Sequence, residues 1–216
     1  GDTSGTSRAS AAVSNGTRAC VALGFRSDVL NEIEYVTISS AGNTTDFGDL
    51  TVARSGSAGN INSTTRGIFA SGYDSNVLDY ITISSTGNAT DFGDSTQKRY
   101  YLGGGGNSTR GVMGGGLVPS GSDQNIIDYV TIASTGNASD FGDLSNARQT
   151  YGACSSSTRV VFGGASASGN SGADSNVSTA GTMDYITIAS TGNATDFGDM
   201  FQGLEFASTS NSHGGL

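Results

Sequence analysis

The sequence of 216 residues has no tryptophan, one proline (Pro119) and one histidine (His213). A single imidazole cannot form a transition-metal site, because such sites gather several nitrogen or sulfur ligands. It also rules out Ser-His-Asp and Cys-His nucleophile systems anywhere but in the Ser/Gly-rich tail that holds His213. We therefore expect no catalytic residues and predict that the protein is not an enzyme.

Charge, cysteine and long apolar runs are also scarce. Charged residues make up 13% of the chain, a low fraction for a disordered protein, and no run approaches the roughly 18 apolar residues of a membrane span. The net charge of −9 argues against nucleic acid and against insertion into, or binding to, anionic membranes. Cys20 and Cys154 occupy different positions of the internal repeat described below, so we predict that both are buried small hydrophobes rather than a disulfide framework.

Glycine, by contrast, is abundant, with 34 residues. Ser, Thr and Asn are also frequent, and Val, Ile, Tyr and Phe occur in short runs. Glycine and β-branched residues disfavour helices, whereas aromatic and β-branched residues suit strands. The composition predicts an all-β protein made of many short strands.

A fourfold internal repeat organises the whole chain. The segment Tyr35–Asp49, which ends in Asp-Phe-Gly-Asp, returns at Tyr80–Asp94, Tyr129–Asp143 and Tyr185–Asp199. An Arg follows the first Asp of this motif by eight residues at Arg54, Arg99 and Arg148, with Arg8 as the copy near the start. A Thr-Arg pair before a hydrophobic stretch recurs at Arg18, Arg66, Arg110 and Arg159.

Each unit predicts four antiparallel strands, the size of one propeller blade. In the last full unit we expect strands near Gln149–Ser155, Arg159–Gly163, Met183–Ala189 and Ala194–Phe197. We predict a small β-propeller forming one domain over 1–216, with units at approximately 1–47, 48–92, 93–141, 142–197 and a partial fifth at 198–216.

Unit length varies almost wholly between the Thr-Arg stretch and the next repeat Tyr. Successive repeat Tyr residues lie 45, 49 and 56 residues apart, and exposed loops tolerate such variation. We expect the longest insertion, Ser166–Thr182, to be exposed.

Most charges repeat with the fold. Only Arg26 and Lys98 among the basic residues lie outside the two Arg positions, and an acidic residue recurs at Glu34, Asp79, Asp128 and Asp184. We expect the repeated Arg residues to pair with repeated carboxylates or backbone carbonyls between blades, because a partly buried Arg needs partners.

The ends of the sequence fall within repeat units. Gly1-Asp2 matches the end of Asp-Phe-Gly-Asp, and 198–216 supplies only the start of a fifth unit. We expect an N-terminal piece to be missing, and favour closure into a five-membered ring whose fifth blade combines both ends. The alternative, in which a neighbouring subunit supplies the missing strands, stays open.

Two loop motifs contain groups of the kinds that bind ligands. The b–c loops (between the second and third strands of a unit) gather oxygen atoms that Ca²⁺ accepts, although Asx-type turns explain them better. These calcium candidates are Asp74, Asn76, Asp123, Asn125, Asp174 and Asn176. The run Gly103–Gly106 lacks the following Lys of a phosphate loop, so strand packing is the better interpretation. We expect no other cofactor.

The order of landmarks resembles the kelch repeat of galactose-oxidase-like propellers. The matching residues in the last unit are Gly163-Gly164, Tyr185 and Phe197, preceded by Arg148, while the kelch Trp is replaced by Phe in all four units. The resemblance implies a propeller. It implies no oxidase, since the copper of galactose oxidase needs paired His ligands.

Residues 131–144 and 187–200 also resemble repeats in proteins encoded by tailed bacteriophages, which are regarded as virion or fibre components. This resemblance implies a structural or adhesive protein, extracellular or in a virion, that binds proteins or cell-surface glycans through its variable loops and can form a homo-oligomer or fibre. The alternatives are a lectin-like or scaffold module of a larger secreted protein and a self-assembling fibre subunit. A galactose-oxidase-type enzyme is the least favoured reading.

Overall fold

The computed structural model describes residues 1–164 and 181–200, and within these ranges the chain forms strands and turns without any helix. The all-β prediction is therefore confirmed for this part of the chain. The described residues form sixteen strands: β1 (Ala11–Ser14), β2 (Arg18–Ala22), β3 (Glu32–Thr37), β4 (Thr45–Asp49), β5 (Ala58–Asn62), β6 (Arg66–Gly72), β7 (Ser75–Thr82), β8 (Thr90–Asp94), β9 (Gly103–Gly106), β10 (Arg110–Gly114), β11 (Ile126–Thr131), β12 (Ser139–Asp143), β13 (Gly152–Ser155), β14 (Arg159–Gly163), β15 (Thr182–Thr187) and β16 (Thr195–Asp199).

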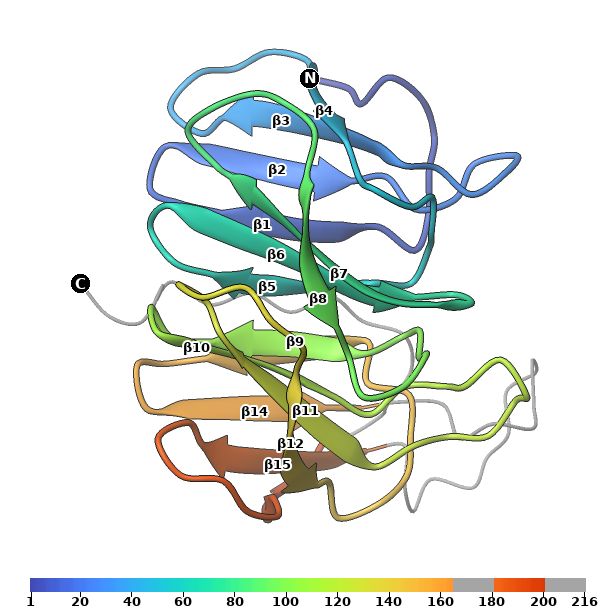
Figure 1. The fold of residues 1–216 in the computed structure, drawn as a ribbon, viewed down its shortest axis with the longest axis vertical. Coiled ribbons are helices and arrows are strands. Elements are labelled where there is room, and N and C mark those ends of the chain that lie inside the picture. Colours follow the sequence, from blue (N-terminus) through green and yellow to red (C-terminus); the bar gives the residue numbers. More distant parts are fainter. Residues whose placement is uncertain (165–180, 201–216) are drawn as a thin grey trace.

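The strands form four antiparallel sheets, each with four strands in chain order, which we call blades 1 to 4. The inner strands follow one another, since β1 contacts β5, β5 contacts β9, and β9 contacts β13. Blades 1 and 4 lie at opposite ends of the view in Figure 1. The four-stranded blades are as predicted, and the described part of the chain is an open arc of blades.

The apolar core lies between successive blades. Phe47, Phe92 and Phe141 are each 2% exposed, and each packs into a cluster that includes residues of the following blade. The repeat Tyr of each blade is half-buried and meets the Phe ring edge-on, with ring centroids 5.8–6.0 Å apart. The repeat Phe therefore forms the between-blade core in blades 1 to 3, whereas Phe197 of blade 4 is 52% exposed.

A main-chain seam explains why Asp-Phe-Gly-Asp and Thr-Gly-Asn recur together. The Gly87 amide of blade 2 donates to the Phe47 carbonyl of blade 1 at 2.7 Å. The Asp49 amide donates to Asn88 Oδ1 at 3.1 Å. Gly48 has φ +138°, and a Cβ there would lie 2.5 Å from the Gly87 backbone, so only glycine fits. The same bonds join blade 2 to blade 3 and blade 3 to blade 4.

Buried ion pairs fix the linkers between blades. Arg54–Asp79, Arg99–Asp128 and Arg148–Asp184 have N–O distances of 2.7, 2.6 and 2.8 Å, with every side chain at most 1% exposed. A repeated β-bulge in the third strand lies immediately before each of these Asp residues. Each Asp also accepts bonds from a linker hydroxyl residue, as Asp79 does from Thr51. Burial lowers the pKa of Arg99, and the charge of Asp128 opposes that shift.

The second Arg set binds the following blade through backbone, as expected. Arg18 lies 4.2 Å from the Tyr35 ring centroid and donates to the Ile83 carbonyl of blade 2 at 3.0 Å. Arg66 and Arg110 repeat both contacts toward blades 3 and 4. Aromatic stacking and a charge-assisted hydrogen bond therefore join each of these blades to the next.

Blade 1 departs from the charge pattern. Arg8 is exposed and lies over the Phe25 ring at 4.6 Å instead of pairing with an acid. Glu34 takes the place of the buried Asp and accepts bonds from the Ser4 amide and the Thr44 hydroxyl. Desolvation raises the pKa of Glu34, but these hydrogen bonds and the charge of Arg26 together leave it below its ordinary value.

Three sequence predictions need correction. Cys20 is fully buried, but Cys154 on β13 is only partly buried, so the prediction that both are buried is wrong for Cys154. The first strand of blade 4 begins at Gly152 instead of near Gln149. Thr182, assigned to the exposed insertion, begins β15 and is 8% exposed. The rest of that insertion, apart from Gly181, and most of the partial fifth unit lie outside the described residues.

Candidate functional site

Four tyrosines break the repeat, and all four lie together. The chain has eight Tyr, of which four occupy the repeat position. The other four, which we call the tyrosine cluster, are Tyr73, Tyr100, Tyr101 and Tyr151. Their ring centroids are 5.1 Å apart between Tyr73 and Tyr100, 4.8 Å between Tyr100 and Tyr101, and 5.0 Å between Tyr101 and Tyr151. Residues from three blades thus form one continuous aromatic surface.

Linker backbone holds the cluster in place. Tyr73 lies in the turn between β6 and β7, Tyr100 and Tyr101 precede β9, and Tyr151 precedes β13. The Gly72 amide donates to the Arg99 carbonyl at 2.9 Å, which places the β6–β7 turn beside Tyr100. The Thr150 amide donates to the Tyr101 carbonyl at 3.0 Å. The rings are therefore positioned by the same segments that carry the buried Arg–Asp pairs.

Tyr101 has a strained backbone. Its φ is +58°, in the left-handed region. Tyr101 lies two residues after Arg99. The residue at the same place after Arg54, in the preceding linker, is Gly56, with φ +68°. A bulky side chain in that conformation is a true outlier, and such outliers gather at functional sites. The positive φ of Tyr101 therefore marks this position as a candidate functional one.

Polar groups surround the rings. The Tyr151 hydroxyl donates to Gln149 Oε1 at 2.6 Å, and Gln149 Nε2 donates to Asp123 Oδ1 at 3.3 Å. Burial raises the pKa of Tyr100, with smaller contributions from Tyr101, Tyr73 and the Asp123 carboxylate. The Tyr100 hydroxyl therefore stays protonated at neutral pH and can donate as well as accept a hydrogen bond.

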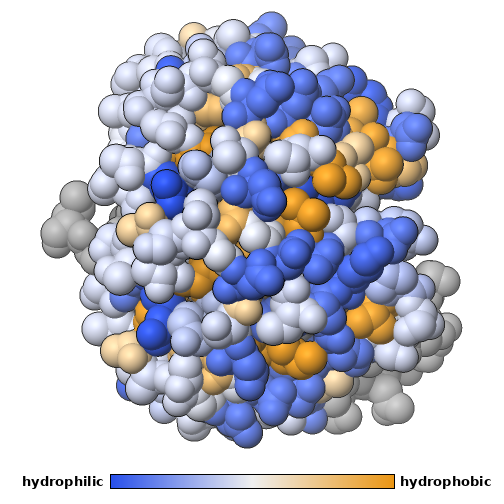
Figure 2. Space-filling view, viewed as in Figure 1, coloured by the Kyte–Doolittle hydropathy of each residue, from blue (hydrophilic) through white to orange (hydrophobic). Residues whose placement is uncertain are grey.

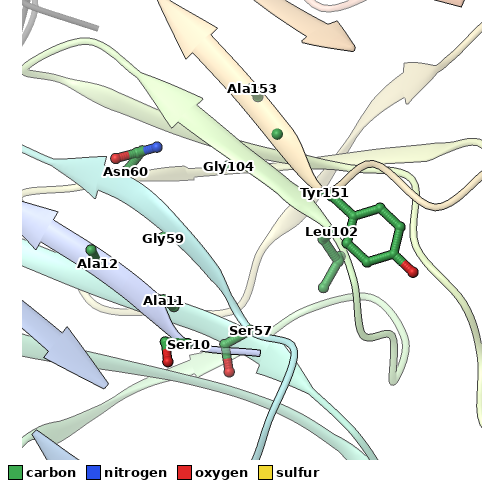
Figure 3. A pocket seen from close by; sticks show the side chains of 11 residues that line it. Ser10, Ala11, Ala12, Ser57, Gly59, Asn60, Leu102, Gly104, Tyr151 and Ala153 are labelled. Atoms are coloured by element: carbon green, nitrogen blue, oxygen red, sulfur yellow. The ribbon is translucent and has the colours of Figure 1, made fainter. Parts of the chain in front are cut away.

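A cavity of about 180 Å³ adjoins the cluster where the inner strands of all four blades meet. Figure 3 shows Ser10 and Ser57 on one side of it and Tyr151 with Leu102 on the other. Gly59 and Gly104 lie in the inner strands, where an added Cβ would overlap the backbone of the neighbouring strand. The glycine run of β9 thus serves close strand packing, in agreement with the sequence interpretation of Gly103–Gly106.

The calcium candidates of blade 2 lie at one tight turn. Asp74 has φ +57°, and its side chain is 69% exposed and accepts a bond from Lys98 Nζ at 3.0 Å. The Asn76 carbonyl accepts the Ser95 amide at 2.8 Å. The local geometry is that of a turn entering a strand.

The calcium candidates of blade 3 contribute to the surroundings of the cluster. Asp123 is bonded to Gln149 as described, and the Asn125 carbonyl accepts the Leu144 amide at 2.7 Å. Asp174 and Asn176 lie outside the described residues. In residues 1–164 and 181–200, no three His, Cys, Asp or Glu side chains gather as a metal site requires.

The sequence interpretation missed the tyrosine cluster because it weighed only the repeated positions and saw no break in their symmetry. The signal was present: Tyr100 and Tyr101 follow one linker Arg directly, whereas Ser55 and Gly56 follow the same Arg in the preceding unit. The tyrosines that lie outside the repeat position are therefore visible in the sequence when its four units are compared.

The outer surface is polar on the face shown in Figure 2, where apolar atoms appear only in small patches between hydrophilic residues. The part of the chain that the structure describes contains no helix long and apolar enough to cross a bilayer. The chain matches no protein-family model and no curated protein sequence.

Proposed function

We propose that the protein is a non-enzymatic adhesive propeller that binds neutral glycans at the tyrosine cluster. The observation that carries this proposal is that every Tyr outside the repeat position belongs to one contiguous surface. A fold held by repeated residues does not need these rings, so binding is the economical explanation of their gathering.

The chemistry of the cluster suits a sugar. A pyranose ring has one apolar face of C–H groups that stacks on an aromatic ring, while its hydroxyls need planar hydrogen-bonding partners around the edge. Tyr supplies a rigid apolar face with a polar tip, and the Gln149 amide lies beside the Tyr151 hydroxyl. The cavity of about 180 Å³ that Tyr151 helps to line leaves room beside this ring for part of a bound ligand. The net charge of −9 favours neutral over acidic sugars.

The setting of this activity follows from the resemblance to phage repeat proteins. We propose a virion or other extracellular assembly, in which an adhesive propeller would contact a cell surface. A lectin-like module of a larger secreted protein would use the same surface, and the neighbouring genes would distinguish the two.

A glycan array of bacterial surface and host-type glycans, followed by titration of each hit, tests the proposal. Because the chain has no Trp, its intrinsic fluorescence comes from Tyr, and a bound sugar should change it directly. Tyr73 is 53% exposed, so Tyr73→Ala should leave the fold intact and weaken binding at least tenfold. Val52→Ala, at a 42% exposed position that is not part of the tyrosine cluster, is the matched control and should bind as the wild type does.

Two results would contradict the proposal. One is the absence of any glycan above background on the array. The other is a hit whose affinity is the same for wild type and Tyr73→Ala. Binding to a cell-surface protein that survives removal of its glycans would assign the surface to protein recognition instead.

A further inference from the structure

Two exposed apolar residues occupy repeat positions that are buried elsewhere. Ile38 is 55% exposed, and its counterparts after the third strand of each later blade are at most 1% exposed (Ile83, Ile132 and Ile188). Phe197 is 52% exposed, and its counterparts Phe47, Phe92 and Phe141 are each 2% exposed. Blade 1 exposes the residue that normally meets a preceding blade, and blade 4 exposes the residue that normally meets a following one.

The three internal junctions show what each exposed surface is built to contact. At the first junction, the Phe47 ring of blade 1 packs in one cluster with Ile81 and Ile83 of blade 2. Arg18 of blade 1 donates to the Ile83 carbonyl at 3.0 Å. At each junction the earlier blade therefore supplies a trailing half, made of the Phe ring, the Arg and the Gly-Asp segment. The later blade supplies a leading half, made of two aliphatic side chains, a backbone carbonyl and a Gly-Asn turn.

Blade 4 presents a complete trailing half, which we call the trailing face. Arg159 lies 4.5 Å from the Tyr185 ring centroid, and the Tyr185 and Phe197 rings are 6.0 Å apart. The corresponding distances inside the protein are 4.2–4.5 Å and 5.8–6.0 Å. This face is thus already in the docking geometry, so binding costs little ordering.

Blade 1 presents the matching leading half, which we call the leading face, formed by Val36, Ile38 and the Gly42–Asn43 turn. Its seam already holds a Gly-Asp segment. The Asp2 amide donates to Asn43 Oδ1 at 2.9 Å, and the Thr44 amide donates to the Asp2 carbonyl at 3.0 Å. Gly1–Asp2 therefore takes the position on blade 1 that Gly48–Asp49 takes on blade 2. The leading face recognises the same peptide as the internal blades.

We propose that the trailing face of one molecule docks on the leading face of a second copy, joining molecules head to tail. Phe197 would pack on Val36 and Ile38, and Arg159 would donate to the Ile38 carbonyl. Gly198–Asp199 would replace Gly1–Asp2 on the seam, so the hydrogen bonds lost and formed are of the same kind. One chain carries both complementary halves, which is why a second copy is the occupant. Such an interface is heterologous and extends into a linear chain unless it closes into a ring.

Sedimentation velocity of the full chain over a range of concentrations tests the proposal. We expect the mean mass to rise above the 21.7-kDa monomer as concentration increases. Phe197→Asp and Ile38→Asp each disable one face, so each variant alone should remain monomeric. An equimolar mixture of the two keeps one intact interface and should stop at the dimer. Val52→Asp carries the same added charge outside both faces and should assemble like the wild type.

The mixing result separates this geometry from any other. If the interface were symmetric, mixing the two variants would create no new intact interface. The mixture would then contain only the species that each variant forms alone. That outcome would overturn the proposal, and so would a wild type that remains monomeric at every concentration, or a Phe197→Asp variant that still assembles. Circular dichroism of each variant checks that the blades remain folded. The glycan test does not depend on assembly, so either proposal can fail alone.

Discussion

Lys98 and Arg99 are neighbours in the sequence, yet their ion pairs lie in opposite environments. The Lys98–Asp74 pair has side chains 50% and 69% exposed, whereas both side chains of Arg99–Asp128 are fully buried. Exposed pairs contribute little because water and salt screen them. A buried pair that loses one partner leaves an uncompensated charge, which is strongly destabilising.

This contrast predicts the effect of neutralising each acid. Asp128→Asn should lower the free energy of unfolding by about 3–5 kcal/mol, because the Arg99 guanidinium stays buried without its carboxylate. Asp74→Asn should change it by less than about 1 kcal/mol. Urea unfolding of the two variants beside the wild type checks this. Similar losses in both would mean that the buried pair does not anchor the linker.

Cys20 predicts a dependence of stability on alkaline pH. Burial raises its pKa from 9.0 to about 11, and the charge of Arg18 opposes this only in part. The folded state therefore holds its proton where the unfolded state loses it. The stability that the buried, protonated Cys20 thiol contributes is complete below about pH 9 and is lost as the pH rises through about 11.

Urea unfolding at about pH 8 and about pH 10.5 measures this contribution. The wild type should lose about 2 kcal/mol more than Cys20→Val over that interval, at 1.36 kcal/mol per unit of pKa shift. Cys154→Val, which leaves Cys20 in place, should behave as the wild type does. An unchanged pH dependence in Cys20→Val would show that the Cys20 thiol does not contribute.

At the scale of elements, the seam between strand and turn is the recurring unit of blade packing. Gly142 and Gly198 occupy the same place in Asp-Phe-Gly-Asp and have φ values of +140° and +126°. An alanine Cβ at Gly142 would lie 2.5 Å from the Gly192 backbone of the next blade, but at Gly198 it would meet nothing within 4 Å. Comparing alanine substitutions at Gly142 and Gly198 therefore distinguishes a clash with the next blade from the strain of the positive φ.

Gly142→Ala should therefore destabilise the protein by about 1–3 kcal/mol more than Gly198→Ala does. Both variants place an alanine at a positive φ, but only the alanine at 142 also overlaps the backbone of the next blade. Thermal unfolding followed by circular dichroism makes the comparison. Equal shifts in Tm would assign the glycine to backbone conformation instead of to blade packing.

The elements were predictable from sequence because the repeat shows each of them four times. Strand β14 falls at the residues that the pattern predicted. Strand starts were less predictable: β13 begins after Tyr151, because the preceding residues form the linker carrying Arg148 and Thr150. The local sequence does not distinguish an extended linker from a strand.

The candidate site could not be predicted in the same way. The tyrosine cluster comes from three blades, and its members occupy unrelated positions of the repeat. Only the positions of the linkers around the inner strands bring these rings together.

In the whole molecule, the repeated residues hold the blades together, and the unrepeated tyrosines form the surface that we propose binds glycans. The Phe of Asp-Phe-Gly-Asp tests the first of these two statements, because the same residue in the same motif is buried against the next blade in one copy and exposed in another. Phe141 is 2% exposed against blade 4, whereas Phe197 is 52% exposed. Both rings meet their own Tyr at nearly the same distance, 5.8 and 6.0 Å.

Urea unfolding of Phe141→Ala and Phe197→Ala, at concentrations where the protein is monomeric, is the most direct measurement. If the junctions between blades carry the stability, Phe141→Ala loses about 3–5 kcal/mol of unfolding free energy, because a buried ring leaves a cavity between blades 3 and 4. Phe197→Ala then loses no more than about 0.5–1 kcal/mol, as expected for an exposed side chain. Equal losses in the two variants would contradict the account, because they would place the stability inside each blade and not between blades.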